Sequence, residues 1–330
     1  MKIANVGNDI AKRWFDLCVI MGEKQIERRF PNNSSGCSEC MVWLASLGAD
    51  IFNVVLEPTG RYSELIADYL FKQERVAVYQ VHPFRFNKFR ESLDFRVGTD
   101  AKSAWALAVY AEERIGKDSK YPPKLYEPKT EIQKELRDIR VRLRSLYKRK
   151  SNLEGHLEAG LVSETIKTDT ACELKQIEQR IESILEFAKT VIAGNAQLSR
   201  DIALIDSITG IGWKTALALV CLIDFRKFKT SRDLACFLGL STRKKESGSS
   251  IHSKGRITKA GDKWVRAALY FPAMTAIQHN PQLRAFSDRL TSRGKIYPVI
   301  RTAVGRKLVT IAWALIKNDT FYNTEVSEPT

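Results

Sequence analysis

Three acidic residues in the first hundred positions have the spacing of a divalent-metal site. Asp9 lies at the end of the first expected strand, Glu57 directly follows the apolar segment 51–56, and Asp100 precedes a helical pattern. The ends of strands and the start of a helix can meet at one edge of an α/β sheet, where carboxylates hold a metal for phosphodiester cleavage. Taken singly, Asp100 is equally a helix N-cap and Asp9 a turn residue.

A segment rich in small residues and cations lies in the second half of the chain. A loop of this kind holds a phosphate against a hydroxyl, but a serine becomes a nucleophile only with a base or a metal beside it. On its own, such a loop is more often a phosphate-binding loop than a nucleophile site. The segment contains Arg243, Lys244, Lys245, Glu246 and Ser247, and it continues through Gly248, Ser249 and Ser250 to Lys254, Arg256 and Lys259.

A second glycine motif, Gly210-Ile211-Gly212, stands before a helix that begins near Lys214. An apolar residue, then Gly-x-Gly, then a helix start resembles a helix-hairpin-helix turn. Glycines in such a turn let backbone N–H groups approach a DNA phosphate at the helix N-terminus. The alternative is an ordinary glycine turn between two helices.

The overall charge favours a polyanionic partner. The chain of 330 residues carries a net charge of +15 and is 44% hydrophobic. Nucleic acid is the commonest partner of so basic a protein, although an indifferent basic surface has the same composition. Residues 137–150 hold seven cations, which phosphate contact explains better than a solvated face. We expect Arg140, Arg144 and Lys148 among them to contact nucleic acid.

Several protein classes are disfavoured. The chain contains no apolar run of about 18 residues and no signal-peptide pattern at its start, so we expect no membrane span and a location in the cytosol. Its six cysteines suggest reduced thiols rather than a disulfide framework. Cys37 and Cys40 form a lone Cys-x-x-Cys without a second pair or a histidine nearby, which disfavours zinc.

The elements that must position these residues follow from periodicity. Strands are expected at 2–6, 15–20, 25–30, 51–56 and 76–81, and helices at 38–47, 62–71 and 101–113, which predicts an α/β domain with a mixed sheet over residues 1–120. A proline-containing linker and two heptad seams predict an antiparallel helical hairpin or coiled coil within 121–200. Residues 201–330 are expected to form a mainly helical domain with a helix-hairpin-helix-like motif and the serine loop. The seams are Ile132, Leu136, Ile139, Leu143, Leu146, Leu153 and Leu157, then Leu174, Ile177, Ile181, Ile184, Ala188 and Val191.

Ordered motifs across nearly the whole chain resemble the DEDD transposases of bacterial insertion sequences, the IS-one-ten family. These are bridge-RNA-guided recombinases related to the pilin-gene invertases. The matching segments are Asp9; Glu57-Pro58-Thr59-Gly60-Arg61-Tyr62; Val81-His82-Pro83; Thr99-Asp100 with Ala104; Ser207 to Gly212; Phe237-Leu238-Gly239-Leu240; Glu246 to Ser250; Thr258-Lys259-Ala260-Gly261; Arg266 to Tyr270; and Arg306-Lys307-Leu308.

The resemblance implies a RuvC-like, RNase H-fold domain, a coiled-coil insertion and a C-terminal transposase domain. It implies Mg²⁺ (or Mn²⁺) held by Asp9, Glu57 and Asp100, and a covalent phosphoserine intermediate formed by Ser247. It further implies double-stranded donor and target DNA as substrates and a structured non-coding guide RNA. A homo-oligomer, dimeric or tetrameric, would share composite sites and associate with the nucleoid when bound to DNA.

One position departs from the family. Its fourth acid is expected three residues after Asp100, where this chain has Ser103, and Gly98 replaces a lysine. A hydroxyl binds a hard cation more weakly than a carboxylate does. Three acids with waters could serve, a nearby acid could substitute, or the enzyme could be impaired. Two further functions therefore stay open: a Holliday-junction-type nuclease with water as nucleophile, and a nucleic-acid-binding protein with a decayed active site.

Overall fold

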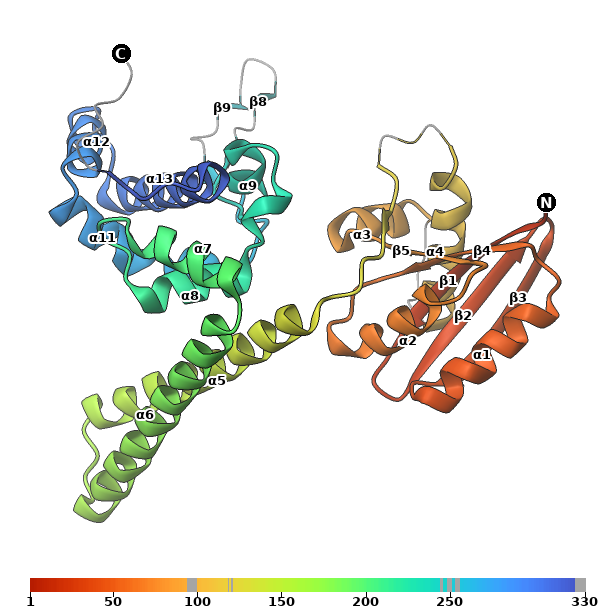
Figure 1. Ribbon diagram of the computed structural model, residues 1–330, viewed down its shortest axis with the longest axis horizontal. Coiled ribbons are helices and arrows are strands. Elements are labelled where there is room, and N and C mark those ends of the chain that lie inside the picture. The colour runs from red at the N-terminus through yellow and green to blue at the C-terminus, as the bar shows by residue number, and fades with distance from the viewer. Residues whose placement is uncertain are drawn as a thin grey trace. The chain divides into compact units, whose positions relative to one another are not determined.

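The chain folds into two compact units, Met1–Lys129 and Thr130–Thr330, each with its own hydrophobic core (Figure 1). The computed structural model describes residues 1–93, 100–117, 119, 121–243, 246–247, 251–252 and 256–323. Among these residues, no helix is long and apolar enough to cross a membrane.

The first unit is built on a six-stranded sheet in the order β3-β2-β1-β4-β5-β6. The first three strands pair antiparallel, the central three (β1, β4 and β5) pair parallel, and β6 is antiparallel to β5. The sheet is therefore mixed, as predicted. The strands are β1 (Ile3–Ile10), β2 (Trp14–Met21), β3 (Lys24–Pro31), β4 (Ile51–Leu56), β5 (Val76–Gln80) and β6 (Lys124–Leu125).

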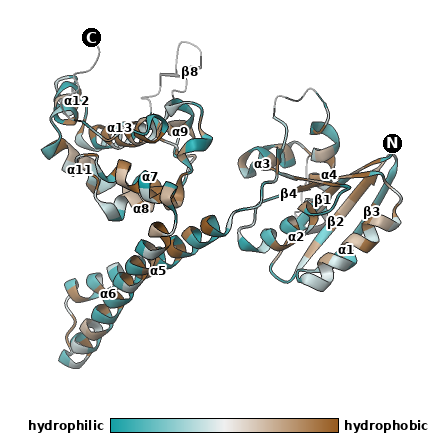
Figure 2. Cartoon of the chain, viewed as in Figure 1, coloured by the Kyte–Doolittle hydropathy of each residue, from teal (hydrophilic) through white to brown (hydrophobic). Residues whose placement is uncertain are grey.

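Helices cover both faces of this sheet. On one face, Leu44 of α1 and Ile66 of α2 share a core with Phe15 and Phe52 of the strands. On the other, Phe86 of α3 and Leu107 of α4 pack with strand residues that include Val55. Figure 2 shows the apolar character of the central strands between these layers. The helices are α1 (Ser34–Ser46), α2 (Arg61–Phe71), α3 (Pro83–Ser92) and α4 (Asp100–Arg114).

Helix α4 approaches the sheet closely at Gly7. A Cβ at this position would lie 1.9 Å from the backbone oxygen of Ala104 and 2.8 Å from the Cβ of Leu107. Only glycine fits there, because the overlap is largely with helix backbone that cannot rotate away. The contact fixes the first turns of α4 over β1.

The second unit is mostly helical, as predicted. Long helices α5 and α6 pack against each other, and their core continues into the helices that follow (Figure 1). Helix α13 contacts α7, α9, α11 and α12. The helices are α5 (Glu131–Glu158), α6 (Glu164–Ala193), α7 (Ala196–Asp206), α8 (Trp213–Leu222), η1 (Phe225–Lys227), α9 (Ser231–Phe237), α10 (Lys263–Ala268), α11 (Tyr270–His279), α12 (Pro281–Ser292) and α13 (Tyr297–Asn318).

The contact between α5 and α6 uses most of the expected seam. Leu136, Ile139 and Leu146 of α5 are buried. In α6 the buried positions move from Ile181 to Leu185 and Ile192, one residue past the expected Ile184 and Val191. An α-helix has 3.6 residues per turn, so its buried face drifts from a strict 3.5-residue repeat.

Candidate nucleic-acid-processing site

Asp9 and Glu57 lie at neighbouring positions at one end of the parallel strands β1 and β4. The register pairs Asn8 with Leu56, and each carboxylate is the next residue along its strand. Both residues are half-buried. Two carboxylates from adjacent strands are thus brought to the same edge of the sheet.

The alternation of side chains places these carboxylates on the face that α4 covers. Gly7, two residues before Asp9, faces α4. Val55, two residues before Glu57, packs with α3 and α4. Residues two apart in a strand point to the same face of the sheet. Glu57 is two residues after Val55, so the alternation of β4, continued by one residue, places Glu57 on the same face as Asp9.

Burial changes the acidity of Glu57. Removal from water disfavours the charged carboxylate and raises the pKa of Glu57, while the nearby Arg90 guanidinium acts in the opposite direction. Arg90 belongs to α3, a helix that periodicity did not predict, so sequence reasoning missed this residue. A short helix with scattered phenylalanines gives little signal beyond the proline at its start.

Asp16 lies directly opposite Asp9 across β1 and β2. It is buried and paired with Arg29, whose Nε donates to Oδ1 at 2.8 Å and whose Nη2 donates to Oδ2 at 3.0 Å. Like charges that face each other across a ladder repel, and Arg29 offsets the repulsion. Since both oxygens of Asp16 are engaged by Arg29, Asp16 is a poor replacement for the absent fourth acid.

Asp100 begins α4, one turn before the contact between Ala104 and Gly7. Because Asp100 is four residues before Ala104, its position is on the face of α4 that meets the sheet. Its side chain lies outside the described part of the structure. Ser103 is half-buried and one turn before Leu107, so it shares that face. Within the described residues, no group of three or more metal-binding side chains is assembled.

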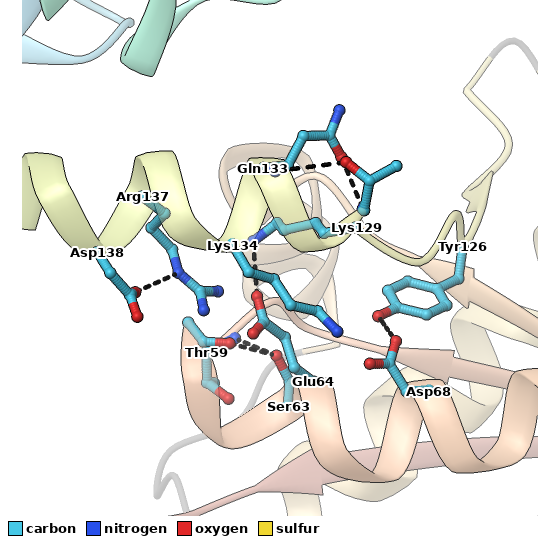
Figure 3. Close-up of polar contacts among 12 residues, drawn as sticks. Thr59, Ser63, Glu64, Asp68, Tyr126, Lys129, Gln133, Lys134, Arg137 and Asp138 are labelled. Carbon is cyan, nitrogen blue, oxygen red and sulfur yellow. Dashed lines mark hydrogen bonds and ion pairs between the residues drawn. The ribbon is translucent and has the colours of Figure 1, made fainter. Parts of the chain in front are cut away.

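The segment after Glu57 forms a tight entry to α2. Gly60 has φ +72°, which favours glycine, and no side chain caps the helix there. The Thr59 N–H donates to Ser63 Oγ at 3.3 Å, and that hydroxyl donates to the Gly60 carbonyl at 3.1 Å (Figure 3). These bonds fix the loop that carries Glu57.

In the second unit, the serine segment forms short strand pairs. Strand β7 (Thr242–Arg243) pairs with β10 (Arg256–Ile257), and β8 (Glu246–Ser247) pairs with β9 (Ile251–His252). The backbone of Ser247 lies opposite Ile251, and its side chain lies outside the described part of the structure. Lys244, Lys245 and Lys254, all expected to bind nucleic acid, also lie outside the described residues. Arg256 and Lys259 are exposed.

Two glycines clamp the base of this hairpin. A Cβ on Gly261 would lie 2.2 Å from the Phe237 carbonyl oxygen, and one on Gly239 would lie 2.7 Å from the Gly261 nitrogen. The guanidinium of Arg266 donates to the carbonyls of Leu238 at 3.1 Å and Gly261 at 2.8 Å. The two segments that lead into and out of the serine hairpin are therefore locked together by backbone contact.

The Gly-x-Gly turn joins α7 to α8, and its two glycines have different surroundings. Gly210 has φ +105°, and a Cβ there would lie 2.7 Å from that of Ala276. Gly212 caps α8, is exposed, and has no atom within 4 Å of an added Cβ. Gly210 therefore has a packing role against α11, while Gly212 leaves the N-terminus of α8 open to an approaching anion.

A hollow of about 400 Å³ lies beside this turn, between α6 and α8. Lys189 of α6 lies over the Trp213 ring at 5.6 Å, and Lys214 lies 3.8 Å from Glu182. Sequence reasoning missed Lys189, because it lies in α6, outside the glycine motif. The hollow, two lysines and an indole ring form a surface suited to a sugar-phosphate chain.

The cations of α5 divide into two groups. Arg140 lies 3.6 Å from Asp262, and Arg144 stacks on Trp264 with its Cζ 3.9 Å from the ring centre. Both therefore hold α5 against the α10 region. Lys148 is exposed, and it makes no ion pair within the described residues. Of these three expected nucleic-acid contacts, Lys148 is the one most open to an outside partner.

Both units of the chain match known transposase families. Residues 6–166 match the DEDD family described as "Transposase", and residues 202–288 match "Transposase IS116/IS110/IS902 family". The pilin gene-inverting proteins of Moraxella bovis and Moraxella lacunata are each 29% identical over 327 residues, covering 98% of both chains. The transposase for insertion sequence element IS1111A of Coxiella burnetii is 28% identical over 160 residues, covering 46% of this chain and 42% of its own.

Two transposase matches lie in order along the chain, the first over most of the first unit and α5, the second over α7 to α12 of the second unit, and they define a transposase. The chain belongs to the IS116/IS110/IS902 family of transposases.

Proposed function

We propose that this protein is a site-specific DNA recombinase that cuts and rejoins strands through a covalent bond between Ser247 and DNA. The observation that carries the proposal is the clamped hairpin. Gly239, Gly261 and Arg266 fix the base of the hairpin. The segment that bears Ser247 therefore starts from a rigid support. A nucleophile gains when the fold restricts its position, and the clamp fixes where the segment that carries Ser247 begins and ends.

The step balances as a transesterification. The Ser247 oxygen attacks phosphorus, the bond from phosphorus to one deoxyribose oxygen breaks, and the hydroxyl proton ends on the released strand oxygen. A phosphoserine ester conserves the bond energy. A hydroxyl from a second strand then attacks the same phosphorus, reforms a phosphodiester and returns the proton to serine.

The carboxylates of the first unit support a metal requirement. We propose that this unit is RNase H-like, with Asp9 and Glu57 at neighbouring strand ends and Asp100 at the start of α4. Hard divalent cations such as Mg²⁺ prefer oxygen ligands of this type. When bound, the ion would stabilise negative charge that develops on the phosphate. Asp9 and Glu57 would hold it, and Ser103 would contribute a weak neutral ligand.

The protein also needs partners. We propose that the α5–α6 pair is a coiled coil through which copies of the chain form an oligomer. We also propose that a structured guide RNA selects the donor and target DNA. The net charge of +15 supports a polyanionic partner, and the exposed Lys148 and Gly212 supply contact points. The full-length similarity to the pilin gene-inverting proteins supports recombination, whether as inversion or as transposition.

The test is retention of DNA on denatured protein. Purified chain is incubated with supercoiled DNA carrying the sequences that flank its gene, with its RNA and Mg²⁺, and is then denatured in detergent. Wild type should retain DNA, and Ser247→Ala should retain none while binding DNA normally. Cleavage without any protein-linked DNA would favour the nuclease alternative, and binding without cleavage would favour a decayed site.

A further inference from the structure

A small hollow of about 160 Å³ opens beside the base of the serine hairpin. Ile257 of β10 and Leu240, which precedes β7, form one side of it. Arg301 and Thr302 of α13 and Tyr270 of α11 form the other. The hollow therefore lies against the stem that leads to Ser247, although no sequence motif had drawn attention to Arg301.

Arg301 is held by aromatic rings rather than by an acid. Its Cζ lies 3.6 Å from the centre of the Tyr270 ring and 5.9 Å from that of Tyr297. Within the described part of the chain it makes no ion pair. The N–H groups of a guanidinium point outward in its own plane, so a guanidinium that stacks on a ring can still bind a phosphate at its edge.

The rings around Arg301 are unusually exposed. Tyr270 is 41%, Phe271 71% and Tyr297 48% exposed, and the rings of Tyr270 and Phe271 meet edge to face with centres 5.1 Å apart. Surfaces that stack unpaired bases typically combine exposed aromatic rings with a neighbouring guanidinium. We call these four residues, Arg301, Tyr270, Phe271 and Tyr297, the Arg301 surface.

The neighbouring stem adds positive charge of its own. Arg256, the neighbour of Ile257 in β10, is exposed, and so is Lys259, two residues past that strand. Exposed cations attract phosphate-bearing partners to the surface around them. The stem therefore favours a phosphate nearby.

We propose that the Arg301 surface binds unpaired nucleotides of the DNA strand next to the bond that Ser247 cuts. Arg301 takes one phosphate, and Phe271 or Tyr297 stacks on an adjacent base. The role of this surface beside a nucleophile rests on the proposed function, but the binding of nucleotides does not require strand cleavage. Strand exchange needs unpaired ends, and a stacking surface holds them without regard to sequence.

Charge distinguishes this occupant from a second copy of the chain. Aromatic residues and arginine also occur in protein interfaces. However, the guanidinium of Arg301 makes no ion pair within the described residues, and the neighbouring stem exposes Arg256 and Lys259. Each copy of this chain carries +15. Its electrostatic complement is a polyanion.

Photocrosslinking tests the proposal directly. The probe is a single-stranded DNA about 12 nucleotides long with 5-iododeoxyuridine in place of thymidine. It is irradiated with the full-length Ser247→Ala protein, and the linked peptides are identified by mass spectrometry. Crosslinks at Tyr270, Phe271 or Tyr297 are expected. Crosslinks confined to other aromatic residues, such as Trp213, would overturn the proposal. Because crosslinking reports binding and needs no strand cleavage, failure of the Ser247 assignment would leave the result unaffected.

A matched pair of variants tests the guanidinium. Arg301→Ala should weaken binding of the same oligonucleotide about 10-fold and lower the slope of log K against log salt by about 0.7. Arg293→Ala removes the same charge from an exposed position at the end of α12 and should leave both values near those of the parent. Equal behaviour of the two variants would contradict the inference. So would a change in oligomeric mass for folded Arg301→Ala, because a second copy would then be the occupant.

Discussion

Glu57 stands beside Asp9 at the end of two parallel strands, one residue past the paired positions Asn8 and Leu56. Burial raises the pKa of Glu57 even though Arg90 opposes the shift. The chain therefore keeps a second carboxylate in surroundings that disfavour its charge. Metal binding is the simplest use for such an arrangement, because a bound cation would favour the ionised form.

Replacing Glu57 with glutamine should separate stability from activity. A carboxyl with a raised pKa in the folded state stabilises the fold below the pKa of the unfolded chain, and this stabilisation is lost as pH rises through the folded pKa. At pH 7 the charged carboxylate of Glu57 therefore lowers the stability of the folded chain. Glu57→Gln should raise the melting temperature at pH 7 but not at about pH 4.

The same variant should lose DNA cleavage by more than about 100-fold, since even outer partners of a metal site contribute 10- to 100-fold. Asp16→Asn is the control, because it breaks the ion pair with Arg29 and should lower the melting temperature. Thermal unfolding at the two pH values and a cleavage assay give both results. A Glu57→Gln protein that cleaves like wild type would remove Glu57 from the metal site.

Ser103 gives a prediction with a gain of function. It is half-buried on the face of α4 that meets the sheet, three residues after Asp100. Ser103→Asp should add a ligand and lower the Mg²⁺ concentration that gives half-maximal cleavage by about 10-fold. Ser103→Asn, of equal size but neutral, should not. Superimposable Mg²⁺ titrations for the aspartate variant and wild type would show that the site is complete without a fourth acid.

The two glycines of the Gly-x-Gly turn should behave differently. Gly210→Ala is strained at φ +105° and pushes a methyl group against Ala276, so it should cost roughly 2 kcal/mol or more of stability. Gly212→Ala meets open space and should fold normally, but its methyl would obstruct a phosphate at the start of α8. Denaturant unfolding and DNA-binding titrations distinguish them. Normal DNA affinity of Gly212→Ala would place the contact elsewhere.

Mixing two inactive variants tests whether protomers share a site. Asp9→Ala lacks a proposed metal ligand and Ser247→Ala lacks the proposed nucleophile, so each alone should show no recombination. If the two parts of one site come from different protomers, mixed oligomers should regain a fraction of wild-type activity. Co-purification with two different tags establishes that mixed oligomers form. The absence of any rescue in such oligomers would mean that each protomer builds its own site.

The alternation of apolar residues predicts most of the first unit. The strand 51–56 was predicted with its observed bounds. Each of the three early strands extends past one or both ends of its predicted range, by one to four residues. Helix α3 was missed because Phe84, Phe86 and Phe89 do not form a helical stripe of the usual spacing. Cys37 and Cys40 of the lone Cys-x-x-Cys are fully buried in the core of the first unit.

The candidate sites were less accessible to sequence reasoning. Strand and helix ends indicate where Asp9 and Glu57 lie, because the direction of parallel strands fixes which ends meet. The partners Arg90, Arg29 and Lys189 come from elements distant in the chain, and no local pattern predicts such contacts. The same holds for the stacking of Arg144 on Trp264, while the expected contact of the exposed Arg144 with nucleic acid stays a prediction.

The most direct test of the account is the identity of the atom that links protein to DNA. Trypsin releases residues 246–254 as one peptide with four serines, namely Ser247, Ser249, Ser250 and Ser253. The covalent complex is digested with trypsin and nuclease, and tandem mass spectrometry locates the residual nucleotide on this peptide. We predict the modification on Ser247. A nucleotide on another serine, or on any residue outside the peptide, would contradict it.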